Sequence, residues 1–231
     1  RPAFDVVAQA MGGAMGITGP DAHTPMKIGP GIGDIFPAAL SAFGIMAAVH
    51  HAQKTGQGQF VDVAMYDGVL AMCERLVYQY SYTGKSPVPE DNQHPILCPF
   101  GVFPTNDGIV TIGCPRDSFW RELADAMGRP ELATDPKFLT NNDRLAHASE
   151  TVGIVETWTR GLTKAEIATA LDGRVPFGPV NTAADIYADP HIAARKMLAE
   201  VEHPGSATAV TIASTPNRMT AKPRGRTGTA P

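Results

Sequence analysis

The longest apolar run in the sequence, residues 35–49, comes directly after a glycine-rich segment that ends in Asp34. Its small residues, and its larger apolar residues at three- and four-residue spacing, predict an amphipathic helix over residues 35–54. The segment Thr55-Gly56-Gln57-Gly58 that follows is typical of a helix end. The run contains Pro37 and is shorter than a bilayer requires, so we do not expect it to cross a membrane.

The segments on either side of this helix predict an α/β arrangement. Residues 4–11 form a short apolar run, and residues 59–64 are rich in the residue types that favour strands. Residues 66–82 predict a second helix, with Asp67 in the first turn, where a carboxylate interacts well with the helix dipole. The order strand, loop, helix, strand, helix is consistent with the tail of a doubly wound sheet.

The rest of the sequence changes character at a segment with four prolines, residues 83–99, which we interpret as a linker. Asp107-Gly108 between two apolar runs then predicts a hairpin. Helices are expected at about residues 116–127, 143–160 and 164–171, and strands at 175–180, 198–201 and 209–212. We therefore divide the chain into part of a large domain, a linker, a small α+β domain and a return segment to the large domain (1–83, 84–98, 99–190, 191–231).

Composition excludes several classes of protein. Hydrophobic residues make up 43% and charged residues 18% of the chain, as in ordinary globular proteins, and the net charge is −4. No block of five like charges occurs, so neither nucleic acid nor an anionic membrane is an expected partner. The three cysteines form no CxxC pair and the histidines no HExxH motif, which predicts no metal site and a cytoplasmic location.

Asp34 is the residue most suggestive of chemistry. Gly29, Gly31 and Gly33 alternate before it, so backbone N–H groups can approach whatever lies beside this carboxylate. Two interpretations are open: a helix N-cap, which is the commoner role of such an aspartate, and a functional carboxylate. The glycines do not form a nucleotide-binding motif, because no Gly-Lys-Ser/Thr follows them, and the sequence has no GxSxG.

The sequence resembles the family III CoA-transferases, a group that includes carnitine and formyl-CoA transferases and α-methylacyl-CoA racemases. The similar segments are ordered along nearly the whole chain. They are FDVVAQAMGG (4–13), GIGD (31–34), TGQGQ (55–59), VDVAMYD (61–67), FPTNDG (103–108), GRPEL (128–132), DPKF (135–138) and VPFGPV (175–180).

This resemblance implies a Rossmann-like large domain, incomplete here, a small α+β domain, and an interlaced homodimer. It also implies that the chain is a fragment, lacking about the first third of the family's length and a short C-terminal piece. The expected partners are an acyl-CoA and a carboxylic acid, with coenzyme A as a cosubstrate and no permanently bound cofactor.

By the same resemblance, Asp34 matches the family's catalytic aspartate, which attacks the acyl-CoA thioester and passes through covalent intermediates. The backbone N–H groups of Gly31 and Gly33 are then the candidate stabilisers of the oxyanion. Met65, and less clearly Phe4, match positions near CoA, with core packing as the alternative for both.

The sequence departs from the family's patterns in two places. The racemases carry a histidine where this chain has Phe4, which cannot transfer a proton. Residues 90–95 contain no glycine, unlike the loop of formyl-CoA transferases. We therefore expect a CoA-transferase acting on a different acid, such as a small dicarboxylate. The alternatives are an acyl-CoA racemase or epimerase and a dimerising fragment without a CoA pocket; the donor and acceptor acids are not identified.

Overall fold

The computed structural model describes residues 2–205 and 208–218. The chain divides into two compact units, residues 1–177 and residues 178–231. The finer division at residues 83, 98 and 190 stays a prediction. Part of the predicted return segment, residues 206–207 and 219–231, lies outside the described residues.

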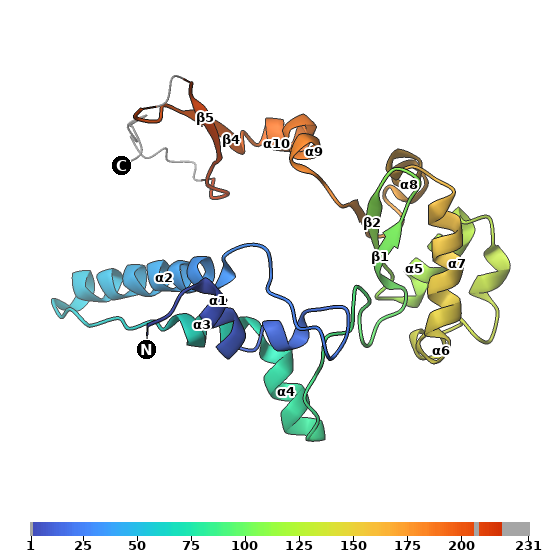
Figure 1. The fold of residues 1–231 in the computed structure, drawn as a ribbon, viewed down its shortest axis with the longest axis horizontal. Helices are drawn as coiled ribbons and strands as arrows, with labels where there is room; N and C mark the ends of the chain where they lie inside the picture. Colours follow the sequence, from blue (N-terminus) through green and yellow to red (C-terminus); the bar gives the residue numbers. More distant parts are fainter. Residues whose placement is uncertain (1, 206–207, 219–231) are drawn as a thin grey trace. The chain divides into compact units, whose positions relative to one another are not determined.

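The first unit begins with a cluster of helices (Figure 1). These are α1 (Asp5–Met11), the 3-10 turn η1 (Met15–Ile17), α2 (Ile32–Thr55), α3 (Met65–Met72) and α4 (Glu74–Thr83). Helices α1, α2 and α3 pack against one another, around a small core that includes Ala8, Val69 and Cys73. This packing places the start of α2, and with it Asp34, against α1.

Three expectations for this region were wrong. Residues 5–11 form helix α1 and not a strand, because Asp5 and Gln9, four residues apart, are joined by hydrogen bonds along a helix face. Residues 59–64 form no strand, since they have no ladder partner among the described residues. The helix predicted over residues 66–82 is divided at Cys73, whose backbone (φ −98°, ψ 38°) leaves the helical region.

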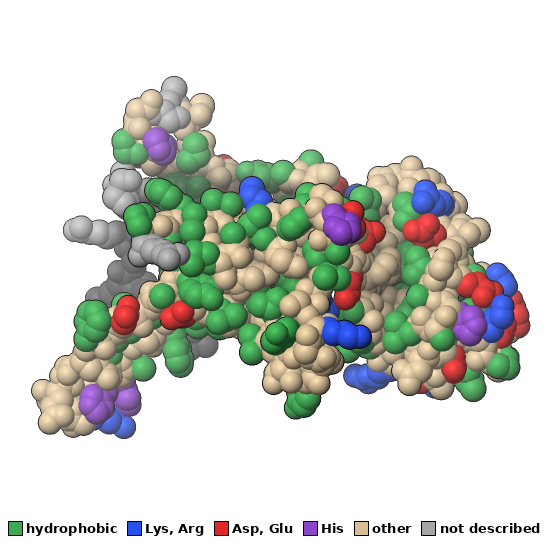
Figure 2. Space-filling model, turned by 60° about the horizontal axis from the view of Figure 1, so that its bottom comes forward, with side chains coloured by type: hydrophobic (Ala, Val, Ile, Leu, Met, Phe, Trp, Pro, Cys, Tyr) green, Lys and Arg blue, Asp and Glu red, His purple; other side chains and the backbone are tan. Residues whose placement is uncertain are grey.

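Helix α2 is longer than the sequence pattern indicated. It spans 24 residues, from Ile32 to Thr55, and it ends at Gly56 in the left-handed conformation. By length and composition alone it is able to cross a membrane, so the expectation that this segment is too short was wrong. Core helices of soluble proteins share this length and composition. Most of the helix is exposed here, including Phe43 and Met46, and Figure 2 shows many hydrophobic side chains at the surface.

The second half of the first unit is built on the predicted hairpin, which is confirmed. Strands β1 (Phe100–Pro104) and β2 (Ile109–Gly113) pair antiparallel, with Phe103 opposite Val110. The helices that follow are α5 (Asp117–Ala126), η2 (Pro130–Ala133), α6 (Asn141–Ala146), α7 (Ala148–Arg160) and α8 (Lys164–Leu171). The helix predicted over residues 143–160 is thus two helices, divided at His147. Strand β3 (Phe177–Pro179) starts where the unit ends, and the sheet order is β1-β2-β3.

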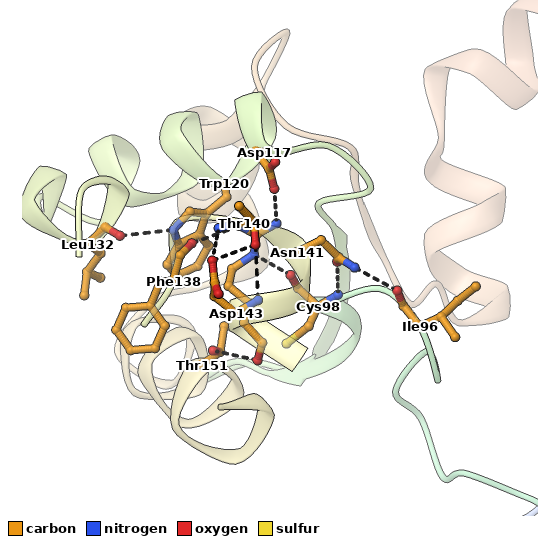
Figure 3. Close-up of polar contacts among 11 residues, drawn as sticks. Ile96, Cys98, Asp117, Trp120, Leu132, Phe138, Thr140, Asn141, Asp143 and Thr151 are labelled. Carbon is orange, nitrogen blue, oxygen red and sulfur yellow. Dashed lines mark hydrogen bonds and ion pairs between the residues drawn. The ribbon is translucent and has the colours of Figure 1, made fainter. Parts of the chain in front are cut away.

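A buried arginine ties this region together. The side chain of Arg144 on α6 is fully buried, and its guanidinium donates to the carbonyls of Cys98 (2.7 Å) and Phe138 (2.9 Å). It also pairs with the Asp117 carboxylate at 2.8 Å and lies over the ring of Trp120. Figure 3 shows Cys98, Asp117, Trp120 and Phe138 in this region. Arg144 therefore links the end of the proline-rich segment to α5 and α6.

The three cysteines are all unpaired and buried. Burial raises the pKa of the Cys73 and Cys98 thiols, and it raises the pKa of Cys114 to about 12. All three are therefore neutral thiols at physiological pH.

The second unit contains α9 (Ala183–Ala188), α10 (Pro190–Ala194), β4 (Leu198–Val201) and β5 (Val210–Ala213). The side chains of Thr182 and Asp189 cap the two helices, which explains why short helices form at these two positions. Strands β4 and β5 pair antiparallel, so both predicted strands are confirmed, the second displaced by one residue. The described part of the chain is thus of mixed α/β type.

Candidate active site

Asp34 is the third residue of α2 and is not its N-cap. The N-cap is Gly31, which makes no side-chain capping bond, so the structure decides against the capping interpretation of Asp34. The Asp34 side chain is exposed, and its carboxylate has no hydrogen bond or ion pair within the described part of the chain. A free carboxylate in the first turn of a helix, where the dipole favours negative charge, is available to react.

A second carboxylate, that of Asp5, lies close by and is fully engaged. Asp5 begins α1, and its Oδ1 accepts the backbone N–H of Gly33 at 2.8 Å. Both of its oxygens also accept from Nε2 of Gln9, at 3.0 and 2.9 Å. A Cβ at Gly31 would lie 3.9 Å from Oδ1 of Asp5 and 3.9 Å from Oδ2 of Asp34. One carboxylate thus supports the loop while its neighbour stays free.

Gln9 connects α1 to the loop that precedes Asp34. Its side chain is fully buried, and its Oε1 accepts the backbone N–H of Ile28 at 2.9 Å. Its Nε2 also lies 3.4 Å from the carbonyl oxygens of Ile28 and Pro30. The loop is therefore fixed at two points just before Gly31.

The two glycines predicted to stabilise an oxyanion differ in this structure. The N–H of Gly33 already donates to Asp5, so this donor is occupied in the structure, and its role toward an oxyanion stays a prediction. The N–H of Gly31 has no hydrogen-bond partner among residues 2–205 and 208–218. Of the two candidate donors, Gly31 is the one open to a ligand beside Asp34.

The residues predicted to contact CoA lie in different environments. Met65 begins α3 and is half-buried against the core of the helix cluster, which is the packing role given as its alternative. Phe4 precedes α1 and is 78% exposed, so core packing does not explain it. The role of either residue toward CoA stays a prediction.

The described residues contain no group of three or more His, Cys, Asp or Glu side chains able to hold a metal ion.

A pocket of about 610 Å³ lies between α4 and residues 90–96. Its lining includes Arg75, Tyr78, Glu90 and His94. Arg75 and Glu90 form an ion pair at 3.5 Å, so the arginine is not free to bind a second carboxylate without competition. Burial, and then the charge of Arg75, lower the pKa of His94. Arg75 and Glu90 of this pocket are thus paired with each other, whereas the carboxylate of Asp34 is open.

Sequence reasoning missed Asp5 and Gln9 as members of the site. Their four-residue spacing was a usable signal, because it places both side chains on one face of a helix. The segment was interpreted as a strand, which would have put Asp5 and Gln9 on the same face but too far apart to pair.

Gly33 gives a testable measure of how closely α1 and α2 approach. A Cβ at Gly33 would lie 2.7 Å from the carbonyl oxygen of Asp5 and 3.0 Å from Cβ of Ala8. We expect Gly33→Ala to displace the start of α2 and to cost about 1–3 kcal/mol of stability, as overpacking does. The measurement is the denaturation midpoint of the variant.

The matched control is Gly153→Ala within helix α7, where a Cβ meets no atom within 4 Å. It should be neutral or should stabilise by up to about 1 kcal/mol, because alanine favours the helix. Equal midpoints for the two variants would contradict the close approach at Gly33.

The model of CoA-transferase family III matches residues 1–231. The succinyl-CoA:mesaconate CoA-transferase of Haloarcula marismortui is 46% identical over 220 residues, 95% of this chain and 55% of the relative. The succinyl-CoA–D-citramalate CoA-transferase of Chloroflexus aurantiacus is 38% identical over 88% of this chain and 51% of the relative.

A solved structure also has a similar fold. The crystal structure of a CAIB/BAIF family protein from Brucella suis superposes with a TM-score of 0.80 at 32% identity, covering 96% of this chain and 57% of that one. The chain thus spans about half the length of the relatives it matches. A family model that matches from the first residue to the last, and relatives that are similar over nearly all of it, lead to one conclusion: this chain belongs to CoA-transferase family III.

Proposed function

We propose that the complete protein containing this chain transfers CoA between an acyl-CoA and a carboxylic acid, with Asp34 as the covalent nucleophile. The observation that carries the proposal is the free, exposed carboxylate of Asp34 in the first turn of α2, beside the open N–H of Gly31. The relatives support the reaction class, since those compared above are named as CoA-transferases.

The first half of the reaction loads the enzyme. A carboxylate oxygen of Asp34 attacks the thioester carbonyl of the donor, and the carbon–sulfur bond breaks to release CoA thiolate and leave a mixed anhydride. The thiolate then attacks the aspartyl carbonyl, which frees the donor acid and forms an aspartyl-CoA thioester. The N–H of Gly31 is the group placed to stabilise the oxyanions.

The second half repeats these steps with the acceptor. The acceptor carboxylate attacks the aspartyl-CoA thioester, which releases CoA thiolate and forms a second mixed anhydride. The thiolate attacks the acceptor's carbonyl, giving the new acyl-CoA and restoring the Asp34 carboxylate. No proton is gained or lost overall, so the chemistry needs no general base at the position of Phe4.

Small dicarboxylic acids are the substrates we propose. The two relatives compared are named for succinyl-CoA with mesaconate or D-citramalate, and residues 90–95 of this chain contain no glycine. A Rossmann-like large domain, an interlaced homodimer, a location in the cytoplasm and CoA bound near Met65 and Phe4 complete the proposal.

Trapping the intermediate tests the proposal directly. The complete protein is incubated with succinyl-CoA and hydroxylamine and then digested with trypsin. Hydroxylamine attacks the activated aspartyl carbonyl and releases the donor acid or CoA. The tryptic peptide of residues 28–54 contains Asp34 as its only acidic side chain, so a hydroxamate on this peptide identifies Asp34 as the activated carboxylate. We expect that hydroxamate to form.

A panel of acyl-CoAs in the same experiment shows which donors load the enzyme. Absence of any adduct on residues 28–54, together with uptake of solvent deuterium at the substrate's α-carbon, would replace the transferase by the racemase alternative.

A further inference from the structure

We propose that Gln9 is a positioning residue for Asp34: acting with Asp5, it sets the loop that presents the nucleophile. The inference rests on the proposed function, since it gives Gln9 its role through Asp34. The observations are the complete burial of Gln9 and its hydrogen bonds to both the Asp5 carboxylate and the loop.

The geometry is that of a two-point clamp. The Oε1 of Gln9 accepts a hydrogen bond from the N–H of Ile28 at 2.9 Å, and Ile28 lies six residues before Asp34. Its Nε2 orients the carboxylate of Asp5, which in turn accepts the N–H of Gly33 at 2.8 Å, one residue before Asp34. The loop between these points is therefore held at both ends through one buried amide.

The clamp also explains which carboxylate is free. The Asp5 carboxylate accepts a hydrogen bond from the N–H of Gly33, and both of its oxygens accept from Nε2 of Gln9. Its charge is therefore stabilised by hydrogen bonds within the fold. Asp34 is left without such bonds, and the N–H of Gly31 stays open. An amide is suited to this role, because it donates to a carboxylate and accepts a backbone N–H at the same time.

The first test replaces Gln9 by methionine, which keeps the length of the side chain and removes its hydrogen bonds. We expect kcat and the rate of Asp34 acylation to fall by about 10- to 100-fold, as small displacements of a reacting group do, with KM for the acyl-CoA changed little. The matched control is Gln57→Met, at an exposed position, which should retain normal rates. Far-ultraviolet circular dichroism verifies that both variants fold.

The second test, Gln9→Glu, separates positioning from mere packing. The ionised carboxylate repels Asp5, the titratable group that it faces on α1, and Asp34 lies nearby on α2. Once protonated, the new carboxyl can donate to Asp5 and accept from Ile28. The rate relative to wild type should therefore rise as the pH falls, whereas the methionine variant should show no such recovery.

The outcomes distinguish this inference from the proposed function. Normal acylation of Asp34 in both Gln9 variants would overturn the role of Gln9 and leave the nucleophile in place. If the methionine variant does not fold, the glutamate variant alone tests the role of Gln9. A ratio of its rate to the wild-type rate that does not change with pH would overturn that role. Absence of the hydroxamate in the wild-type protein would instead remove the proposed function itself.

Discussion

Replacing Asp34 with alanine should lower the rate of acyl exchange by about 10³-fold or more, because removal of a covalent nucleophile eliminates the route through the intermediate. The fold should be retained, since the Asp34 carboxylate makes no hydrogen bond within the described chain and is exposed. The loss of its interaction with the helix dipole costs only about 0.3–1 kcal/mol. The measurement is the exchange rate between succinyl-CoA and a panel of dicarboxylates in the complete protein.

Asp67 offers a matched control for this substitution. It is the third residue of α3, as Asp34 is of α2, and it is also exposed. Asp67→Ala makes the same change to a helix N-terminus, so it should lower stability by a similar amount and leave exchange near normal. Near-normal exchange in the Asp34 variant would remove Asp34 from the mechanism.

Replacing Arg144 with methionine should destabilise the protein by about 2–6 kcal/mol, because each of two buried carbonyls that loses its donor costs about 1–3 kcal/mol. The change leaves the carbonyls of Cys98 and Phe138 without their donor, and both residues are buried. Asp117 contributes less to the loss, because its side chain is 42% exposed and water can replace the guanidinium. Urea denaturation of the complete protein, followed by circular dichroism, measures the effect.

Arg129 provides the comparison. Its side chain is 52% exposed and pairs with Glu131 at 2.6 Å. Arg129→Met removes the same charge from the same kind of residue, and we expect a change of at most about 1 kcal/mol, as for surface ion pairs. Similar losses of unfolding free energy in the two variants would show that the burial of Arg144 contributes little to stability.

The elements that sequence patterns predicted well are those whose signals are local. The hairpin forms where its turn residues Asp107-Gly108 predicted it, and helix α8 spans the predicted residues, with the Thr163 side chain capping its start. The strand predicted over residues 59–64 failed for a different reason. Its β-forming composition was real, but a strand needs a partner, and composition does not reveal whether one is present.

From the residues alone, Asp34 after its glycines had a helix N-cap as the commoner interpretation, and its catalytic role came from the resemblance to the family. The sequence could not predict which glycine N–H is occupied. Gly33 donates to Asp5 and Gly31 does not, and this difference depends on how α1 packs against α2. The hydrogen bonds of Gln9 to Ile28 and Pro30 join residues about twenty positions apart, and periodicity carries no information on such pairs.

The burial of every cysteine has a consequence for side reactions. An acyl-CoA is an acylating agent, and an accessible thiolate is a better nucleophile toward it than a carboxylate is. Cys73 belongs to the same small core as Met65, within the helix cluster that carries Asp34, yet it is buried and its pKa is raised. Cys98 and Cys114 are likewise buried and protonated. In the proposed mechanism, none of the three cysteines of this chain therefore supplies a thiolate that competes with Asp34 for the acyl group, and none is exposed to form a mixed disulfide with the thiol of CoA.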